Sequence, residues 1–343
     1  MNQLEVKDLH VGFEEKKGYK SIINGITFTV REGETLCIVG ESGCGKSLTS
    51  LSVMGLLPGL GKITNGHILF NGDDLSKKNQ KELSRIRGNE ISMIFQEPMT
   101  SLNPVHTVGK QISEAIRIHQ KVTKKEATEK AIEMLRLVGI PSPETRIKSY
   151  PHEMSGGMRQ RVMIAMALVC KPKLLIADEP TTALDVTIQA QILELMGNLK
   201  EEFGMSIMMI THDLGVVSEV ADRVLVMYAG EVVEMSDAKD LFKHPKHPYT
   251  KGLIRSLPTL GDDEQEELPT IKGSVPSPDN MPEGCRFSTR CPFAKEECFT
   301  VKPELYEEGK GTVRCWMYSD KWEQMQGGST DDPAIGEAVS ATT

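Results

Sequence analysis

The feature of this 343-residue sequence that most constrains its fold is a glycine-rich loop at residues 40–47. The loop reads Gly-Glu-Ser-Gly-Cys-Gly-Lys-Ser and fits the phosphate-loop pattern G-x-x-x-x-G-K-[ST]. The apolar run at residues 35–39 predicts a strand that is buried on both faces, and the apolar spacing after residue 47 predicts a helix. Strand, loop and helix in this order favour an α/β domain over a chance match in a glycine-rich turn.

The residue types of the loop suit the phosphates of a nucleotide. Glycines let backbone N–H groups turn inward, and the following helix N-terminus adds partial positive charge. Lys46 is expected to reach the β- and γ-phosphates of ATP, and Ser47 to hold Mg²⁺. The predicted nucleotide-binding set is Gly40, Glu41, Ser42, Gly43, Cys44, Gly45, Lys46, Ser47 and Leu48.

A second element of the phosphate site is an acidic pair at the end of the apolar run 174–178. Asp178 would stand at the carboxyl edge of the sheet, close to the metal, and Glu179 could orient the attacking water. An Asp-Glu pair after a strand is usually a solvated turn. Its combination with the phosphate loop favours the catalytic interpretation.

The rest of the chain extends the α/β pattern. Alternating apolar residues at 4–9 and 25–30 predict strands, and residues 108–137 have helical spacing. Strands that alternate with helices predict a mostly parallel sheet. Further buried strands are expected at 91–95, 173–177, 206–210 and 223–227.

Charge and hydropathy disfavour two classes of protein, those that bind nucleic acids and those that span a membrane. The net charge is −8, but five acids lie in residues 262–267 and four more lie from residue 323 onward, so the remainder is nearly neutral. This balance disfavours a nucleic-acid protein, which usually carries a basic stripe. The N-terminus lacks the pattern of a signal peptide. The longest apolar stretch, residues 163–170, is shorter than the ~20 residues that span a bilayer, so action at a membrane would need a partner.

The segment Ser-Gly-Gly-Met-Arg-Gln-Arg at residues 155–161 resembles the signature of ABC-transporter ATPases. Met154 precedes it where that family usually has Leu, which is a volume-conserving change. The resemblance implies that Gln96 is the Q-loop glutamine and a further Mg²⁺ ligand. It also implies that Asp185, in the Ala183-Leu184-Asp185 segment, belongs to the D-loop, and that His212 is the switch histidine that contacts the γ-phosphate. Glu179, His212 and Gln96 form the implied catalytic set.

The resemblance further implies a site shared between two chains. Ser155, Gly156 and Gly157 precede an apolar helix, whose N-terminus suits an anion. In the family this end and the D-loop residue Asp185 face the ATP bound by a partner subunit. An aromatic residue is also expected to stack on adenine. Phe13 is the first candidate and Tyr19 the second, although either could be an ordinary core or surface residue.

The resemblance sets out a domain organisation. The ABC nucleotide-binding fold of P-loop NTPases implies a RecA-like core, an antiparallel β subdomain and a helical subdomain. This ATP-binding domain is expected over residues 1–257, with its helical subdomain at about 97–160. Composition adds three predictions: a linker rich in Pro, Gly and acids at 258–282, a small Cys-rich region at 283–322 and a disordered tail at 323–343.

Longer segments are similar to the D-type ATP-binding subunits of dipeptide and oligopeptide importers. They are residues 93–104, 150–153, 247–250, 284–287 and 290–293. The resemblance implies an ATP-hydrolysing motor for peptide uptake at the cytoplasmic face of the membrane. The implied partners are a paralogous F-type ATPase subunit, two permeases and an extracytoplasmic peptide-binding protein. Related importers carry nickel, so the cargo stays open.

Two other functions are alternatives for a chain with these motifs. A soluble ABC ATPase that works on DNA or ribosomes usually has tandem ATPase domains or a long coiled coil, and this chain shows one set of motifs and no heptad run. A regulatory subunit with little catalysis is disfavoured by Glu179 and His212. A pair of ATP sites with unequal activity stays open.

Four of the seven cysteines crowd into 31 residues near the end of the chain. Disulfides are not expected in a cytosolic ATPase. Zinc usually takes ligand pairs two to four residues apart, which are lacking here, whereas a [4Fe–4S] cluster accepts more varied spacings. We favour the cluster, with a structural role, over zinc and over unliganded core cysteines. The predicted ligands are Cys285, Cys291, Cys298 and Cys315.

Overall fold

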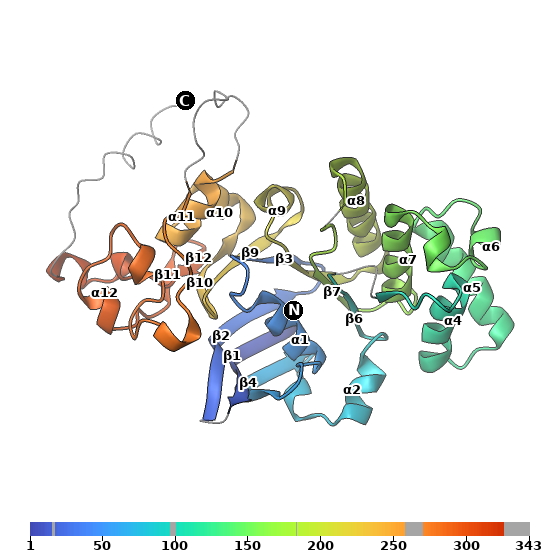
Figure 1. Ribbon diagram of the computed structural model, residues 1–343, viewed down its shortest axis with the longest axis horizontal. Helices are drawn as coiled ribbons and strands as arrows, with labels where there is room; N and C mark the ends of the chain where they lie inside the picture. The colour runs from blue at the N-terminus through green and yellow to red at the C-terminus, as the bar shows by residue number, and fades with distance from the viewer. Residues whose placement is uncertain (16–17, 97–100, 183, 258–269, 326–343) are drawn as a thin grey trace. The chain divides into compact units, whose positions relative to one another are not determined.

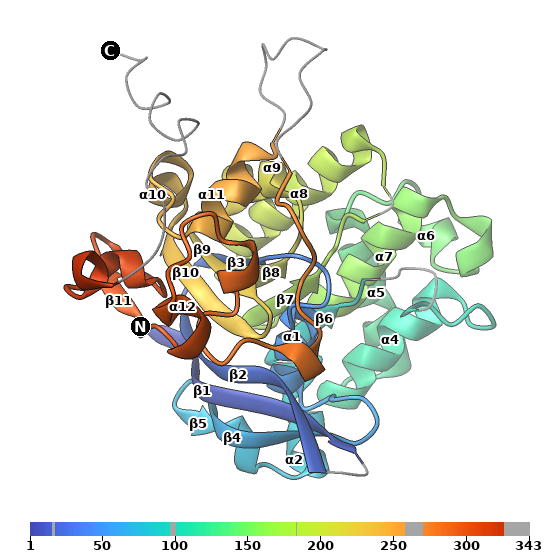
Figure 2. The ribbon, with the colours of Figure 1, turned by 60° about the vertical axis from the view of Figure 1, so that its left-hand side comes forward.

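The computed structural model forms two compact units, Met1–Glu231 and Val232–Thr343 (Figures 1 and 2). It describes residues 1–15, 18–96, 101–182, 184–257 and 270–325. The predicted tail beyond residue 325 and the first part of the predicted linker, 258–269, therefore lie outside the described residues. The remaining linker residues, 270–282, hold no strand or α-helix.

An antiparallel sheet opens the first unit. Strand β1 (Asn2–Glu15) pairs with β2 (Gly18–Arg31) and β4 (Gly61–Phe70), and β4 pairs with β5 (Asp73–Asp74). The two alternating segments predicted to be strands lie within β1 and β2, so that prediction is confirmed. The sequence did not predict β4, because its ten residues include two glycines and lack a regular alternation of apolar side chains.

A parallel sheet forms the core of the first unit, in the order β9-β3-β8-β7-β6. Every residue of β3, β7, β8 and β9 is buried, as continuous apolar runs predict for a sheet covered on both faces. The α/β prediction is therefore confirmed. The strand bounds are β3 (Thr35–Val39), β6 (Ile91–Ile94), β7 (Leu174–Asp178), β8 (Ser206–Ile210) and β9 (Arg223–Tyr228).

Helices follow these strands and also form a separate group. The group α4, α5, α6 and α7 lies together at one side of the first unit in Figure 1. Helix α5 begins with a reciprocal capping box between Thr123 and Glu126, which satisfies two backbone donors. The helices of the unit are α1 (Lys46–Met54), α2 (Gln80–Ile86), α4 (Val108–His119), α5 (Lys124–Leu137), α6 (Pro143–Arg146), α7 (Gly156–Leu168), α8 (Val186–Phe203) and α9 (Leu214–Val220). Short 3-10 turns lie at Leu75–Lys77 and Pro151–Glu153.

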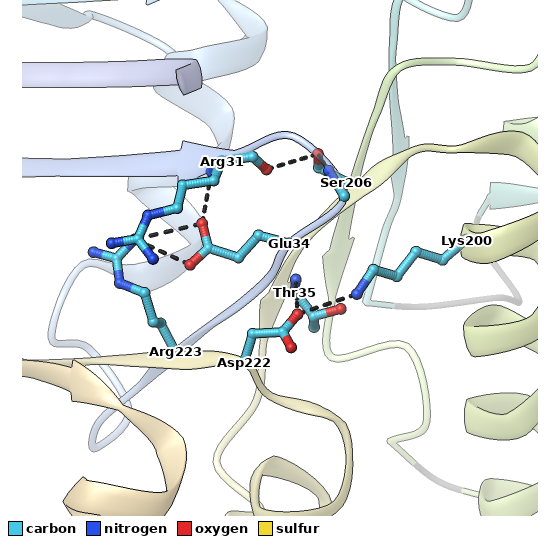
Figure 3. Close-up of polar contacts among 8 residues, drawn as sticks. Arg31, Glu34, Thr35, Lys200, Ser206, Asp222 and Arg223 are labelled. Carbon is cyan, nitrogen blue, oxygen red and sulfur yellow. Dashed lines mark hydrogen bonds and ion pairs between the residues drawn. The ribbon is translucent and has the colours of Figure 1, made fainter. Parts of the chain in front are cut away.

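A buried ion pair fixes the turn that joins the two sheets of the first unit (Figure 3). Arg223 Nη1 lies 3.0 Å from Glu34 Oε1, and both side chains are less than a tenth exposed. Glu34 Oε2 also accepts a hydrogen bond from the backbone N–H of Arg31. The pair thus connects the start of β9 with the chain between β2 and β3, immediately before the strand that leads to the phosphate loop.

The second unit contains a small antiparallel sheet and short helices. Strand β10 (Glu231–Asp237) pairs with β12 (Gly311–Val313), which pairs with β11 (Tyr306–Glu308). The contact between Glu234 and Val313 explains why residues 232–257 group with the C-terminal region. A compact contact unit is not the same as a domain, so the division near residue 257 stays a prediction. The helices are α10 (Ala238–Lys243), α11 (Pro248–Arg255) and α12 (Glu297–Thr300), with 3-10 turns at Pro278–Asn280, Ser288–Arg290, Trp316–Tyr318 and Trp322–Gln324.

No helix in the described part of the chain is both long enough and apolar enough to cross a bilayer.

Candidate functional site

The phosphate loop lies directly after β3, at the carboxyl edge of the parallel sheet. A Cβ at Gly40 would lie 2.2 Å from the backbone oxygen of Met227, so only glycine fits this close approach. Gly45 caps α1 with a φ of 102°, a conformation that L side chains rarely adopt. The glycines therefore hold the loop in the shape in which its N–H groups can face a phosphate.

Lys46 folds over the loop from the first residue of α1. Its ammonium donates to the backbone oxygens of Gly40, at 2.7 Å, and Glu41, at 3.1 Å. The side chain is only 6% exposed. The Cys44 sulfur lies 3.8 Å from the ammonium, and burial raises the pKa of the Cys44 thiol. A buried ammonium that donates to two backbone oxygens provides a fixed positive charge at the loop.

Ser47 and Asp178 meet as the sequence predicted for a metal site. The Ser47 hydroxyl donates to Asp178 Oδ1 at 3.1 Å. Asp178 is the last residue of β7 and is 5% exposed. Burial raises the pKa of its carboxyl above the ordinary value. A hydroxyl and a carboxylate beside the phosphate loop supply the oxygen ligands that Mg²⁺ prefers.

Two of the three residues predicted to be catalytic, Gln96 and His212, contact the third, Glu179. Gln96 Nε2 donates to Glu179 Oε2 at 3.0 Å, and His212 Nδ1 lies 3.2 Å from Oε1. They come from three different segments, which follow β6, β7 and β8. The sequence analysis missed Thr182, whose hydroxyl also donates to Glu179 Oε2 at 3.0 Å. Only its place three residues after Glu179, in the turn that follows Pro180, could have indicated this contact.

The backbone and the charge of Glu179 are both unusual. Its φ is 49°, in the left-handed region that non-glycine residues seldom occupy. Such strain persists where the surroundings enforce it, and it often marks functional sites. Burial would raise the pKa of its carboxyl, but hydrogen bonds from His212 and Thr182 outweigh burial and lower it. Glu179 is therefore held as a carboxylate that accepts three hydrogen bonds.

The signature residues lie at the start of α7. Ser155 is the N-cap, and its hydroxyl accepts from the backbone N–H of Met158 at 3.4 Å. Ser155 and Gly156 are exposed, and a Cβ at Gly156 would meet nothing within 4 Å. No hydrogen bond in the described ranges joins Ser155, Gly156 or Gly157 to the loop of the same chain. The helix end is open for a different ligand.

Two contacts relate this helix to its neighbours. Gln160 Nε2 donates to the backbone oxygen of Pro180, which connects α7 to the turn after Glu179. Asp185 caps α8 by accepting from the N–H of Ile188 at 2.9 Å. Asp185 is also exposed, so the cap leaves it accessible. Ala183 of the predicted D-loop, like residues 97–100 after Gln96, lies outside the described residues.

The two candidate aromatic residues lie on the paired strands β1 and β2. Phe13 packs against Gly61, where a Cβ would come within 2.9 Å of its ring. Tyr19 is 52% exposed, and its hydroxyl accepts from Lys62 at 3.3 Å. Nothing in these contacts selects one ring for adenine, so both assignments stay predictions.

The four clustered cysteines line one small cavity in the second unit, together with His247 and Ser288. Burial, with a smaller contribution from the neighbouring cysteines, raises the pKa of Cys291 and of Cys315 to about 12. Every cysteine of the chain is outside a disulfide in the described structure. Within the described ranges, no three His, Cys, Asp or Glu side chains are arranged to hold a single metal ion.

Comparisons with known proteins identify the family to which the phosphate loop and its surrounding residues belong. The ABC transporter family matches residues 23–182, and the C-terminal region of the oligopeptide/dipeptide transporter family matches residues 233–298. The oligopeptide transport ATP-binding protein AppD of Bacillus subtilis is 56% identical over 320 residues, which cover 93% of this chain and 97% of the relative. The dipeptide transport ATP-binding protein DppD of the same organism is 52% identical over 322 residues, which cover 93% and 96%.

A solved structure shows the same fold. The ATP-binding cassette MJ0796, described as a dimer in a post-hydrolysis state bound to ADP and Pi, has a TM-score of 0.62 and 26% sequence identity. The match covers 68% of this chain and 98% of that one. The chain belongs to the ABC transporter ATP-binding proteins, in the oligopeptide and dipeptide group.

Proposed function

We propose that this chain is the ATP-hydrolysing motor subunit of a peptide-importing ABC transporter. The convergence of Gln96, Thr182 and His212 on Glu179, beside the loop that carries Lys46, is the observation that supports hydrolysis. The relatives named for oligopeptide and dipeptide transport support the cargo class. A dipeptide, an oligopeptide and a metal such as nickel are the cargoes to compare.

The residues divide the chemistry of ATP hydrolysis among them. Lys46 and the loop N–H groups would hold the β- and γ-phosphates, and Ser47, Asp178 and Gln96 would hold Mg²⁺ directly or through water. The lowered pKa of Glu179 makes it a weak base at neutral pH. Glu179 therefore acts mainly by orienting the attacking water, and His212 would contact the γ-phosphate.

The exposed end of α7 supports a site shared with a second subunit. Ser155 and Gly156 are exposed at this end, and a helix N-terminus favours a phosphate. The related cassette that was solved as a dimer supports this arrangement. We assign the partner role to a paralogous F-type subunit, with Asp185 beside the shared ATP.

A cavity of about 320 Å³ at Phe95, the residue before Gln96, suits a contact with a membrane permease. It is lined mostly by apolar groups, among them Met54, Phe95, Met163 and Met166. Methionine-rich surfaces adapt well to an inserted helix. Two permeases would hold the chain at the cytoplasmic face of the membrane, where an extracytoplasmic binding protein delivers the peptide.

The four cysteines that line one cavity are the observation that supports an iron–sulfur cluster. Four thiols approach it from separate segments, and the buried hydroxyl of Ser288 has no hydrogen-bond partner there. A cluster separates its thiolates farther than a single ion does, because each thiolate binds a different iron atom. The cysteine spacing, which lacks ligand pairs two to four residues apart, favours [4Fe–4S] over zinc. When bound, the cluster would crosslink the four thiolates and stabilise a segment with little core.

Two experiments test the proposal. In Glu179→Gln, ATP should still bind and a dimer with the F-type subunit should persist, while hydrolysis falls by about 100-fold or more. Glu90→Gln is the matched control, because Glu90 pairs with Lys173 at the surface. Undiminished turnover in Glu179→Gln would remove Glu179 from this role.

The second experiment is purification from native membranes followed by reconstitution with the co-purifying permeases. ATP-dependent uptake of a labelled dipeptide or oligopeptide is expected. Co-purification with ribosomes or DNA instead would contradict the transport function. Anaerobically purified chain should be brown with stoichiometric iron, and colourless protein with one zinc per chain would overturn the cluster.

A further inference from the structure

Two buried polar side chains line the cysteine cavity without being metal ligands. His247 is 1% exposed and Ser288 is 2% exposed. His247 precedes α11, whereas Ser288 begins the 3-10 turn between Cys285 and Cys291. Both residues line the cavity with the four cysteines, although the predicted cluster needs only the four thiolates as ligands.

The hydrogen bonds of His247 determine which ring nitrogen carries the proton. Its Nδ1 accepts from the backbone N–H of Tyr249 at 3.1 Å, so the lone pair of Nδ1 is used. The neutral ring must therefore carry its proton on Nε2. A histidine that binds a metal through Nε2 carries its proton on Nδ1 instead. His247 is thus a hydrogen-bond donor toward its surroundings and not a ligand.

The ring of His247 is held in place by its neighbours. The buried carboxylate of Glu234 accepts from the backbone N–H groups of Lys246, at 2.9 Å, and His247, at 2.8 Å. The ring of Phe287 lies edge-on at a centroid distance of 5.7 Å. In the described ranges, no group accepts a hydrogen bond from His247 Nε2.

Ser288 is a second donor without an acceptor. Its backbone N–H donates to the oxygen of Cys285 at 2.9 Å, which fixes the turn, but its hydroxyl has no partner. Leaving a buried hydroxyl unpaired costs ~1–3 kcal/mol. Two such donors beside four sulfurs indicate an acceptor that belongs in the cavity.

We propose that the Nε2–H of His247 and the hydroxyl of Ser288 donate hydrogen bonds to sulfur atoms of the cluster held by the four cysteines, and thereby raise its reduction potential. This inference rests on the proposed cluster. Hydrogen bonds to the sulfurs are among the factors that set the potential of such clusters. The direction follows from electrostatics, because the partial positive charge of a donor favours the reduced form, which carries one more negative charge.

The test uses the full-length chain, purified anaerobically, in three variants. Ser288→Ala removes one donor. His247→Asn removes the other, and its side-chain oxygen can replace Nδ1 as the cap of α11, so that folding is preserved. Thr312→Val is the matched control, because Thr312 also has a buried hydroxyl without a partner but does not line the cavity.

The measurement is a redox titration followed by EPR, with iron content and circular dichroism as checks of loading and folding. Each donor variant should lower the ratio of reduced to oxidised cluster about tenfold at a fixed potential, which is about 59 mV for a one-electron couple. Exchangeable-proton coupling to the reduced cluster should weaken in both donor variants. The Thr312→Val variant should match the wild-type potential.

The outcomes separate the two proposals. Colourless wild-type chain refutes the cluster itself. A brown wild type whose potential and proton coupling are unchanged in Ser288→Ala and His247→Asn refutes the donors alone. A shift of equal size in Thr312→Val would show a general packing effect and would also overturn the inference.

Discussion

The buried ion pair between Arg223 and Glu34 gives the sharpest prediction of stability (Figure 3). Replacing Arg223 by Met keeps an unbranched aliphatic chain in place of the arginine stem and removes the guanidinium. The Glu34 carboxylate is only 5% exposed. In the variant it still accepts a hydrogen bond from the N–H of Arg31 but loses the positive charge of Arg223. Breaking a buried pair in this way costs ~3–5 kcal/mol, because the remaining charge stays desolvated.

That cost can be expressed as a melting temperature. A unit of this size loses ~2–4 °C for each kcal/mol, so Arg223→Met should melt on the order of 10 °C below the wild type. Differential scanning calorimetry of the full chain measures it. The transition of the first unit is recognised because ATP shifts it upward.

Two variants control this reasoning. Lys200→Met breaks the pair between Lys200 and Asp222, which is 3.1 Å long but has a carboxylate that is 57% exposed, so it should cost less than ~1 kcal/mol. The double variant Arg223→Met with Glu34→Met removes the stranded charge and should be more stable than Arg223→Met alone. The reasoning is refuted if Arg223→Met melts no lower than Lys200→Met, or if the double variant is as unstable as the two single losses added together.

Three further predictions concern the phosphate site. Gly40→Ala should abolish ATP binding and lower the melting temperature, because its Cβ would meet the Met227 oxygen at 2.2 Å. Gly197→Ala is the control and should keep ATP binding, because Gly197 lies in α8 with open space around it and without a positive φ; equal losses in equilibrium dialysis would contradict this. Asp178→Asn should raise the melting temperature of the nucleotide-free chain at pH 7, since the raised pKa of Asp178 means that its charged form destabilises the fold. The gain in melting temperature should vanish as the pH falls below 3.8, the ordinary pKa of the carboxyl group. The Mg²⁺-dependent stabilisation by ATP should be lost in this variant. A melting temperature below that of the wild type at pH 7 would refute the prediction. Thr182→Ala should slow hydrolysis about fivefold, because Glu179 loses one hydrogen bond. The acidic limb of the pH–rate profile should move to higher pH, because the pKa of Glu179 rises without this donor. Thr182→Ser should restore the rate and the pH profile.

Local sequence was sufficient where the backbone itself is the functional group. The loop at residues 40–47 needs glycines and a helix start, and both are contiguous in the chain, so the pattern identified the site without a partner from elsewhere. The same holds for Ser155, which caps α7 as its position before an apolar helix predicts. Continuous apolar runs likewise predicted the buried parallel strands, because burial on both faces leaves no alternation.

Tertiary structure decided which distant side chains meet. Gln96 and His212 are distant from Glu179 in the sequence and meet its carboxylate only in the folded chain. Thr182 contacts the same carboxylate beside a left-handed backbone at Glu179, which no residue type in that segment indicates. The donor role of His247 depends on a hydrogen bond to Nδ1 and on a cavity completed by Cys315, 68 residues farther along the chain. Sequence patterns report local geometry, whereas protonation and ligand choice depend on the atoms that folding brings within hydrogen-bonding distance. The phosphate loop was therefore predictable from local sequence, and Gln96 and His212 from the family resemblance, whereas the contact of Thr182 with Glu179 and the place of His247 beside the cysteines came only from the folded structure.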